Sequence, residues 1–293
     1  MKVGFIGIGN MGAPMAANVL KRGYEVIVYD ADAQRSARYA AERQCQAAKT
    51  LADLSSVDVV VTMLPTGPIV REVMLETEGK GLAAHLKRGV IVIDMSSSEP
   101  VGTRELGAAL APFGVALIDA PVSGGVPRAI SGTLAIMIGG DSKEAIARAK
   151  PVLSAMGDRL FEVGGLGAGH AMKALNNYVA AAGYAAASEA LLIGQRFGLD
   201  PGTMIDIINV STGRNFSTEA TMKENVIGRK FATGFQLGLL AKDVRIAADL
   251  GKAVKLDAPV SRLICDRYAL ARDRIGATHD NSEAIMGWND ELP

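Results

Sequence analysis

The opening of the chain constrains its fold more than any other feature. A β-branched apolar run over residues 2–8 passes into a glycine-rich segment, and a helical pattern begins directly after it. The segment has the pattern GxGxxG and consists of Gly7, Ile8, Gly9, Asn10, Met11 and Gly12. A strand that turns into a helix through such glycines predicts the first βαβ unit of a doubly wound α/β domain.

Each glycine of this turn has its own physical task. One permits the tight turn, the next lets a pyrophosphate approach the backbone, and the third lets the helix pack against the strand. The helix N-terminus adds amide donors and the positive end of the helix dipole. The sequence therefore predicts a dinucleotide-phosphate site at Gly7, Gly9, Asn10, Met11 and Gly12.

An acidic residue follows at the spacing that a dinucleotide-binding domain requires. Asp30 ends the second apolar run, 25–29, about 20 residues after the glycines. A carboxylate there accepts hydrogen bonds from the adenosine ribose and repels a 2′-phosphate, which favours NAD over NADP. The alternative is that Asp30 only begins the next turn, and the spacing favours ribose recognition.

Hydrophobic patterning divides the chain into two parts. Residues 1–163 alternate short β-branched runs with amphipathic stretches, which is typical of a parallel sheet covered by helices. After residue 163 the strands stop, and glycines lead into a long helical segment over 170–197. We therefore expect a Rossmann-like NAD-binding domain over 1–163 and an all-α domain over 164–293, entered through a long helix.

The expected elements follow from the same patterning. Strands are expected at 2–8, 25–29, 57–63, 90–94, 116–119 and 134–139. Helices are expected at 11–22, 34–43, 68–75, 100–111, 170–197, 201–210, 216–228, 242–251, 259–274 and 282–292.

Charge and cysteine content exclude several classes of protein. The chain has 31 Lys and Arg against 31 Asp and Glu, so bulk positive charge does not draw it to nucleic acid. Its 2 cysteines, Cys45 and Cys265, lie far apart and form no disulfide framework, which fits a reducing cytoplasm.

Membrane and metal sites are not expected either. The longest apolar stretch, 178–194, contains Ser188 and Glu189 and falls short of a membrane span. His85, His170 and His279 are too scattered to form a metal site.

Two turns that could offer backbone groups to a ligand follow the third and fourth expected strands. Leu64 and Pro65 follow the strand at 57–63, and Ser96 and Ser97 follow the strand at 90–94. Doubly wound folds bind ligands at this carboxyl edge, so these residues are expected to hold the nicotinamide side of the cofactor. Taken singly, each segment is an ordinary turn.

The candidate catalytic residue is Lys173, early on the long helical segment. Asn176 and Asn177 follow at helical spacing, and the flanking residues are small or apolar. A lysine on a largely buried helix needs a partner, and a ligand is one such partner. Acting as a base near neutral pH would require its pKa to fall by about three units, or about 4 kcal/mol.

A second candidate segment precedes the last expected strand. Ser123 offers a hydroxyl, and Gly124 and Gly125 can turn their amides toward an anion such as a carboxylate. Taken alone, the segment is equally well explained as a loop.

These motifs together resemble the β-hydroxyacid dehydrogenases, the group of 3-hydroxyisobutyrate dehydrogenases and tartronate semialdehyde reductases. The resemblance covers essentially the whole chain. It rests on the segments 7–18, 119–125 with 132–134, 167–169 with Lys173 and the two asparagines, and Phe235 leading to Lys242 and Asp243.

The resemblance implies roles for individual residues. A substrate carboxylate is expected at Ser123, Gly124 and Gly125, with Lys173 as general acid/base. Asn177, with Asn176, is expected to orient the substrate, and Lys242 to lie near the nicotinamide end of the cofactor. The implied activity is NAD-dependent oxidation of a small β-hydroxy acid to its semialdehyde by a homodimer or homotetramer.

Alternatives remain at the level of substrate and activity. The chain could instead reduce a small semialdehyde such as tartronate semialdehyde, or bind NAD as a non-catalytic interaction module. A basic residue at position 128 is similar to the tartronate semialdehyde reductases, whereas an asparagine at position 177 is similar to the 3-hydroxyisobutyrate dehydrogenases. Arg214 either selects the distal group of the substrate or is an exposed loop arginine.

Overall fold

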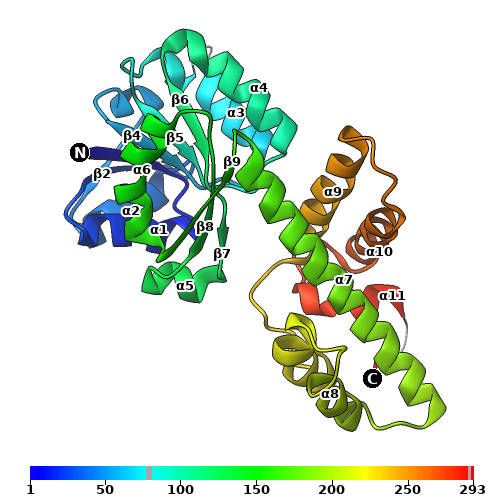
Figure 1. Cartoon of the computed structure of the whole chain (residues 1–293). Coiled ribbons are helices and arrows are strands. Elements are labelled where there is room, and N and C mark those ends of the chain that lie inside the picture. Colours follow the sequence, from blue (N-terminus) through cyan, green and yellow to red (C-terminus); the bar gives the residue numbers. More distant parts are fainter. Residues whose placement is uncertain (77–80, 290–291) are drawn as a thin grey trace. The chain divides into compact units, whose positions relative to one another are not determined.

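A computed structural model of the chain describes residues 1–76, 81–289 and 292–293 (Figure 1). The chain forms two compact units, Met1–Lys173 and Ala174–Pro293. Each unit has a hydrophobic core of its own. Among the described residues, no helix combines the length and apolar character needed to cross a membrane.

The first unit is built on one sheet, which has nine strands over the described residues. The strand order is β3-β2-β1-β4-β5-β6-β8-β7, with β9 beside β8. The strands are β1 (Lys2–Ile6), β2 (Glu25–Tyr29), β3 (Gln46–Ala47), β4 (Val59–Thr62), β5 (Ile91–Asp94), β6 (Ala116–Asp119), β7 (Val122–Ser123), β8 (Ala135–Gly139) and β9 (Arg159–Gly164).

Neighbouring strands are parallel from β3 through to β6. The carboxyl ends of these strands therefore share one edge, and the strand order reverses between β1 and β4. Doubly wound folds bind their ligands at such a reversal point. Beyond β6 the sheet is mixed, because β8 runs antiparallel to β6 and β7.

Helices cover both faces of the sheet. Side chains alternate along a strand, so β1 supplies Val3 and Phe5 to one core cluster and Ile6 to the other. Met15 of α1 packs in the first cluster and Val70 of α3 in the second. The helices are α1 (Gly12–Lys21), α2 (Ala33–Arg43), α3 (Gly67–Leu75), α4 (Pro100–Leu110), α5 (Gly125–Ser131) and α6 (Lys143–Met156).

The helix α7 begins in the first unit and continues into the second, which is helical. The core of the second unit contains Tyr184, Tyr268 and Trp288. The ring centroid of Trp288 lies 5.2 Å from that of Tyr268 and 5.9 Å from that of Tyr184. The helices are α7 (Ala168–Phe197), α8 (Pro201–Asn209), a π-helical segment η5 (Thr218–Ile227), α9 (Leu237–Ala253), α10 (Pro259–Ile275) and α11 (Ala284–Trp288).

The fold class predicted from the sequence is confirmed, and the differences are local. All six expected strands are present, but β1 ends at Ile6 because the chain turns at Gly7. The patterning missed β3, β7 and β9, which are short or largely exposed, and also missed α5 and α6. In the expected last helix, residues 290 and 291 lie outside the described part of the chain.

Candidate cofactor and catalytic residues

Two of the three glycines in the turn after β1 are required by backbone contacts. A Cβ at Gly7 would meet the carbonyl oxygen of Met63, and one at Gly12 would meet the carbonyl oxygen of Gly7. Gly7 also has φ +94°, in the region that favours glycine. A Cβ at Gly9, by contrast, would meet nothing within 4 Å.

The open side of Gly9 is the space through which a phosphate group could approach the backbone. Helix α1 begins at Gly12, so the amides of its first turn and the positive end of its dipole lie at this same turn. Asn10 is exposed and Met11 half-buried. The turn therefore fits the pyrophosphate of a dinucleotide.

Asp30 is joined directly to this turn. Its Oδ2 accepts a hydrogen bond from the amide of Ile8 at 2.8 Å, and its Oδ1 accepts one from the amide of Asp32 at 3.0 Å. Arg35 Nη1 lies 3.2 Å from Oδ1 and 3.3 Å from Oδ2. The carboxylate is thus held at the end of β2 beside the phosphate-binding turn.

The turns after β4 and β5 are also linked. Leu64 donates its amide to Ser96 Oγ at 2.9 Å. Asp94, at the end of β5, accepts hydrogen bonds from the Ser96 amide at 3.0 Å and from Thr62 Oγ1 and Ser98 Oγ at 2.9 Å. Buried Asp94 therefore fixes the shape of the edge where the nicotinamide side is expected.

Pro65 and Ser97 complete the predicted residues at this edge. Pro65 is exposed and Ser97 is half-buried. Both lie on the carboxyl side of the sheet, in the turns that the contact between Leu64 and Ser96 holds together.

The start of α7 is anchored to the end of β6 by Asp119. Asp119 Oδ1 accepts a hydrogen bond from the Gly167 amide and its Oδ2 accepts one from the His170 amide, both at 2.8 Å. The His170 ring is fully buried, with Nδ1 2.8 Å from Thr103 Oγ1 and Nε2 3.7 Å from Asp94 Oδ2. These contacts fix the first turn of the helix that carries Lys173.

The predicted carboxylate segment spans the end of β7 and the start of α5. Ser123 is half-buried, whereas Gly124 and Gly125 are exposed with φ +133° and +65°. A Cβ at Gly124 would collide with the side chain of Arg128, whose aliphatic stem therefore covers this glycine.

The predicted residues on α7 differ in exposure. Lys173 is half-buried and is the last residue of the first unit. Asn176 is exposed and Asn177 is buried, and Asn176 donates its Nδ2 to Asn177 Oδ1 at 3.1 Å.

In the second unit, Asn177 belongs to a buried polar cluster. Its Nδ2 donates to Asp243 Oδ2 of α9 at 2.6 Å. Lys242 Nζ lies 3.3 Å from Asp243 Oδ1, and the side chains of Lys242 and Asp243 are 10% and 3% exposed. A buried amide and carboxylate held beside a half-buried ammonium can orient a polar ligand with little rearrangement.

Arg214 lies in the loop after α8. Its side chain is 63% exposed, and its Nε lies 3.5 Å from Glu219 Oε1. This surface ion pair is the contact that the structure gives its guanidinium.

Sequence reasoning included Asp119 and Asp243 only as parts of motifs, gave the Asp94 carboxylate no role, and placed His170 beside the catalytic helix, where it could affect substrate charge. A signal was present for two of them, since Asp94 and Asp119 are acidic residues that end apolar strands. The partners of Asp243 and His170 come from distant segments, so the sequence contained no local sign of their contacts. Within the described ranges, no group of three or more His, Cys, Asp or Glu is arranged to hold a metal ion.

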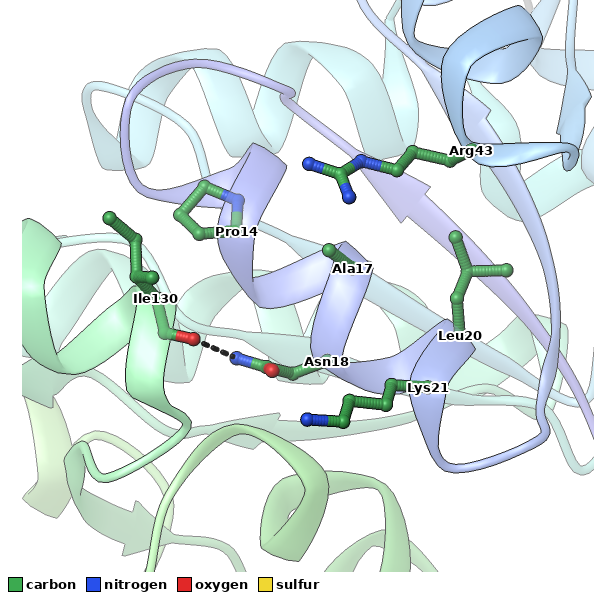
Figure 2. A pocket seen from close by; sticks show the side chains of 7 residues that line it. All are labelled: Pro14, Ala17, Asn18, Leu20, Lys21, Arg43 and Ile130. Carbon is green, nitrogen blue, oxygen red and sulfur yellow. Dashed lines mark hydrogen bonds between the residues drawn. The ribbon is translucent and has the colours of Figure 1, made fainter.

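A separate surface hollow runs along α1 (Figure 2). Asn18 Nδ2 closes one end by donating to the carbonyl oxygens of Ala129 at 2.7 Å and Ile130 at 3.4 Å. The lining contains none of the predicted site residues and consists of Pro14, Ala17, Asn18, Leu20, Lys21, Arg43 and Ile130.

Comparison with known proteins places the whole chain in one family. Residues 2–165 match the NAD-binding domain of 6-phosphogluconate dehydrogenase, and residues 167–288 match the NAD-binding domain of NADP-dependent 3-hydroxyisobutyrate dehydrogenase. The chain is 36% identical to 2-(hydroxymethyl)glutarate dehydrogenase from Eubacterium barkeri over 98% of this chain and 95% of that one. The chain belongs to the β-hydroxyacid dehydrogenase family.

Solved structures agree with this family. The Mycobacterium tuberculosis 3-hydroxyisobutyrate dehydrogenase with L-serine is 33% identical, with a TM-score of 0.88 over 98% of this chain and 99% of that chain. The structure of Psf3 in complex with NADP+ and 2-OPP is 25% identical, with a TM-score of 0.83 over 98% of this chain and 100% of that chain. The predicted family, fold and enzyme class are confirmed: this β-hydroxyacid dehydrogenase is an NAD(P)-binding oxidoreductase that acts on CH–OH groups.

Proposed function

We propose that this dehydrogenase oxidises a small β-hydroxy acid to its semialdehyde, with NAD as hydride acceptor and Lys173 as general acid/base. The main observation in support of this proposal is the spacing of polar side chains along α7. Lys173 is followed one turn later by buried Asn177, which Asp243 holds by a hydrogen bond of 2.6 Å. A catalytic lysine needs a neighbouring group that orients the substrate, and the side-chain amide of Asn177 is a polar group held in place for this purpose.

The first unit supplies the residues that would hold the cofactor. The turn from Gly7 to Gly12 would bind the pyrophosphate, and Asp30 the adenosine ribose. Leu64, Pro65, Ser96 and Ser97 would border the nicotinamide side. Lys242 belongs to the second unit, and only the family resemblance supports its proposed role at the nicotinamide end. NAD, when bound, supplies the hydride acceptor. The Asp30 carboxylate supports NAD over NADP, because it would repel a 2′-phosphate.

The protein residues manage the substrate and its proton. Lys173 takes the proton from the hydroxyl in oxidation and returns it in reduction. Asp243 accepts a hydrogen bond from the amide nitrogen of Asn177 and so holds that amide in one orientation, in which it would contact the substrate. Asn176, which donates to Asn177, supports the same orientation. Ser123 and the amides of Gly124 and Gly125 would hold the substrate carboxylate.

The relatives indicate what the substrate has in common. Two relatives are named as dehydrogenases of 2-(hydroxymethyl)glutarate and of 3-hydroxyisobutyrate. A solved structure of a further relative contains L-serine. All three compounds contain a hydroxymethyl group on the carbon that bears the carboxylate. We therefore assign a primary alcohol β to a carboxylate as the substrate class, with Arg214 as a candidate contact for the distal group.

A substrate panel tests the proposed function. The full-length protein is mixed with NAD or NADP and with 3-hydroxyisobutyrate, L-serine, 2-(hydroxymethyl)glutarate or glycerate, and reduced cofactor is followed by absorbance. We expect turnover of at least one acid with NAD and slower turnover with NADP. Binding of NAD without turnover of any β-hydroxy acid, and without reduction of tartronate semialdehyde by NADH, would favour the non-catalytic interaction module.

We further propose that the chain assembles into a homodimer or homotetramer. The second unit exposes large apolar side chains on α7 and α8, with Val179 66%, Ile193 70%, Phe197 85% and Ile207 58% exposed. Apolar side chains exposed on this scale are typical of a protein–protein interface. Light scattering coupled to size-exclusion chromatography measures the oligomer directly, and a monomer would contradict the assignment.

We place the protein in the cytoplasm. Cys45 and Cys265 are both free and half-buried, and burial raises the pKa of each thiol. Free thiols of this kind suit a reducing compartment. Fractionation of the source cells tests this placement.

A further inference from the structure

Arg35, in the first turn of α2, faces the carboxylate of Asp30. Its Nη1 is 3.2 Å and 3.3 Å from the two oxygens of Asp30, and its Nη2 is 3.8 Å from Asp32 Oδ2. The Arg35 side chain is 48% exposed, whereas that of Asp30 is 10% exposed. A ligand can therefore reach the guanidinium, and the guanidinium covers the carboxylate.

The Asp30 carboxylate has few acceptor positions left for a ligand. An ionised carboxylate offers about four lone-pair positions in all. The Ile8 amide uses one on Oδ2, and the Asp32 amide uses one on Oδ1. Arg35 Nη1 faces the remaining position on each oxygen. Two ribose hydroxyls would need these same positions, so a ribose and Arg35 compete for Asp30.

The backbone of Arg35 is fixed, so the displaced guanidinium would stay close to this place. Asp32 is the N-cap of α2, and its Oδ1 accepts hydrogen bonds from the amides of Gln34 at 3.0 Å and Arg35 at 3.1 Å. Only the Arg35 side chain has to turn when a ligand enters. The guanidinium of arginine is well suited to bind a phosphate group, because it can donate two parallel hydrogen bonds to the phosphate oxygens.

We propose that Arg35 is a specificity-determining residue that sets the ratio in which this dehydrogenase binds NADP and NAD. Arg35 weakens NAD binding because it occupies the acceptor positions of Asp30. It also supplies the cation that a 2′-phosphate requires, which partly offsets the repulsion from Asp30. This inference rests on the proposed cofactor site and deepens it, since the ribose role alone involves only Asp30.

Calorimetric titration of the full-length protein with NAD and with NADP tests the proposal. Arg35→Ala should tighten NAD about 2- to 5-fold, the range of an exposed ion pair. The same variant should weaken NADP about 10-fold or more, because a charge-assisted contact to phosphate is lost. Arg38→Ala is the matched control, since Arg38 is an exposed arginine on the same helix. It should leave the affinity ratio within about 2-fold.

A second pair of variants tests the link between the two residues. Asp30→Asn removes the charge that holds Arg35 but keeps an oxygen that can accept from the Ile8 amide, so the phosphate turn is retained. This variant should gain NADP affinity, and Asp30→Asn/Arg35→Ala should lose that gain.

Two results would overturn the proposal. One is an equal change of the NADP-to-NAD ratio in Arg35→Ala and Arg38→Ala, which would reflect net charge alone. The other is an NADP gain that persists in the double variant. Binding requires no substrate, so absence of hydroxy-acid turnover would count against the proposed function and leave these affinities interpretable.

Discussion

The two units of this dehydrogenase hold their polar residues in different ways. In the first unit, candidate residues stand at the carboxyl ends of parallel strands, and Asp30 reaches the turn after β1 by a single hydrogen bond to Ile8. In the second unit, Asn177 and Asp243 are 66 residues apart in sequence and meet between two helices. Sheet topology fixes the first arrangement, whereas helix packing fixes the second.

In the first unit, some candidate binding positions can change without a loss of stability. In the second unit, the same residues are expected to contribute to binding and to stability. At the sheet edge, open positions such as Gly9 can change without affecting the core, because nothing packs against them. In the helical unit, the polar cluster is itself part of the interior, so its residues contribute to folding as well as to binding.

The largest expected effect is on catalysis. Lys173→Ala should lower turnover about 100- to 10,000-fold, the range for loss of a positioned acid/base, and leave NAD affinity within about 2-fold. Lys143→Ala, at an exposed lysine that begins α6, is the control and should keep full turnover. Steady-state kinetics and calorimetry measure both. Unchanged turnover in Lys173→Ala would exclude Lys173 as the acid/base.

The next effect is on folding of the second unit. Asp243→Ala leaves the buried Asn177 amide and the Lys242 ammonium without this acceptor, so the free energy of unfolding should fall by about 3 kcal/mol. Asp249→Ala, which breaks an exposed ion pair with Lys252 on the same helix, should change the free energy of unfolding far less, because solvent screens this pair. Urea denaturation measures both, and equal losses would show that the buried cluster has no special role.

Two glycine variants separate stability from cofactor binding within the first unit. Gly12→Ala places a methyl group against the backbone carbonyl of Gly7 and should lower the free energy of unfolding by about 2 kcal/mol. Gly9→Ala should unfold like the wild type but bind NAD about 10-fold more weakly, because its methyl group enters the open side of the turn. Thermal unfolding and calorimetry separate the two. Normal NAD binding by Gly9→Ala would place the pyrophosphate elsewhere.

The smallest effect concerns the pH dependence of stability. Burial alone raises the pKa of Asp280, but hydrogen bonds from Ser282, Thr233 and the Gly234 amide outweigh it and lower the pKa below its ordinary value. Because the folded pKa is the lower one, this stabilisation is present above about pH 4 and is lost as pH falls through the folded value.

Replacing this carboxylate should remove that part of the pH dependence. Asp280→Asn should cost about 1 kcal/mol at neutral pH, the size of a helix-cap effect, and less in acid. Urea denaturation at pH 7 and in acid checks this. A loss of the same size at both pH values would contradict the assigned pKa shift.

The sequence predicts the parts of the site that depend on local geometry. A glycine turn after a β-branched run and an acid at the end of the next run place Gly7 through Gly12 and Asp30 at one sheet edge. The strand at 134–139 was predicted, but its antiparallel direction as β8 was not, because the residue pattern of a buried strand does not reveal the direction of its neighbours.

The contacts made by His170, Asp243 and Arg35 could not be predicted. His170 meets Thr103 across 67 residues, and Asp243 meets Asn177 across 66. Such pairs depend on which helix faces pack together, and a single sequence does not encode that in any local spacing. Arg35 is only five residues from Asp30, but its exposed position gives no periodic signal.

Deuterium transfer tests whether hydride moves directly from the carbinol carbon of the substrate to NAD. A β-hydroxy acid accepted by the wild-type protein is labelled with deuterium at its carbinol carbon, and the reduced cofactor is analysed by mass spectrometry after turnover with NAD. Direct transfer from that carbon to the nicotinamide predicts one deuterium per reduced cofactor in the wild-type reaction. Reduced cofactor without deuterium, or semialdehyde formed without reduction of NAD, would exclude direct hydride transfer to NAD.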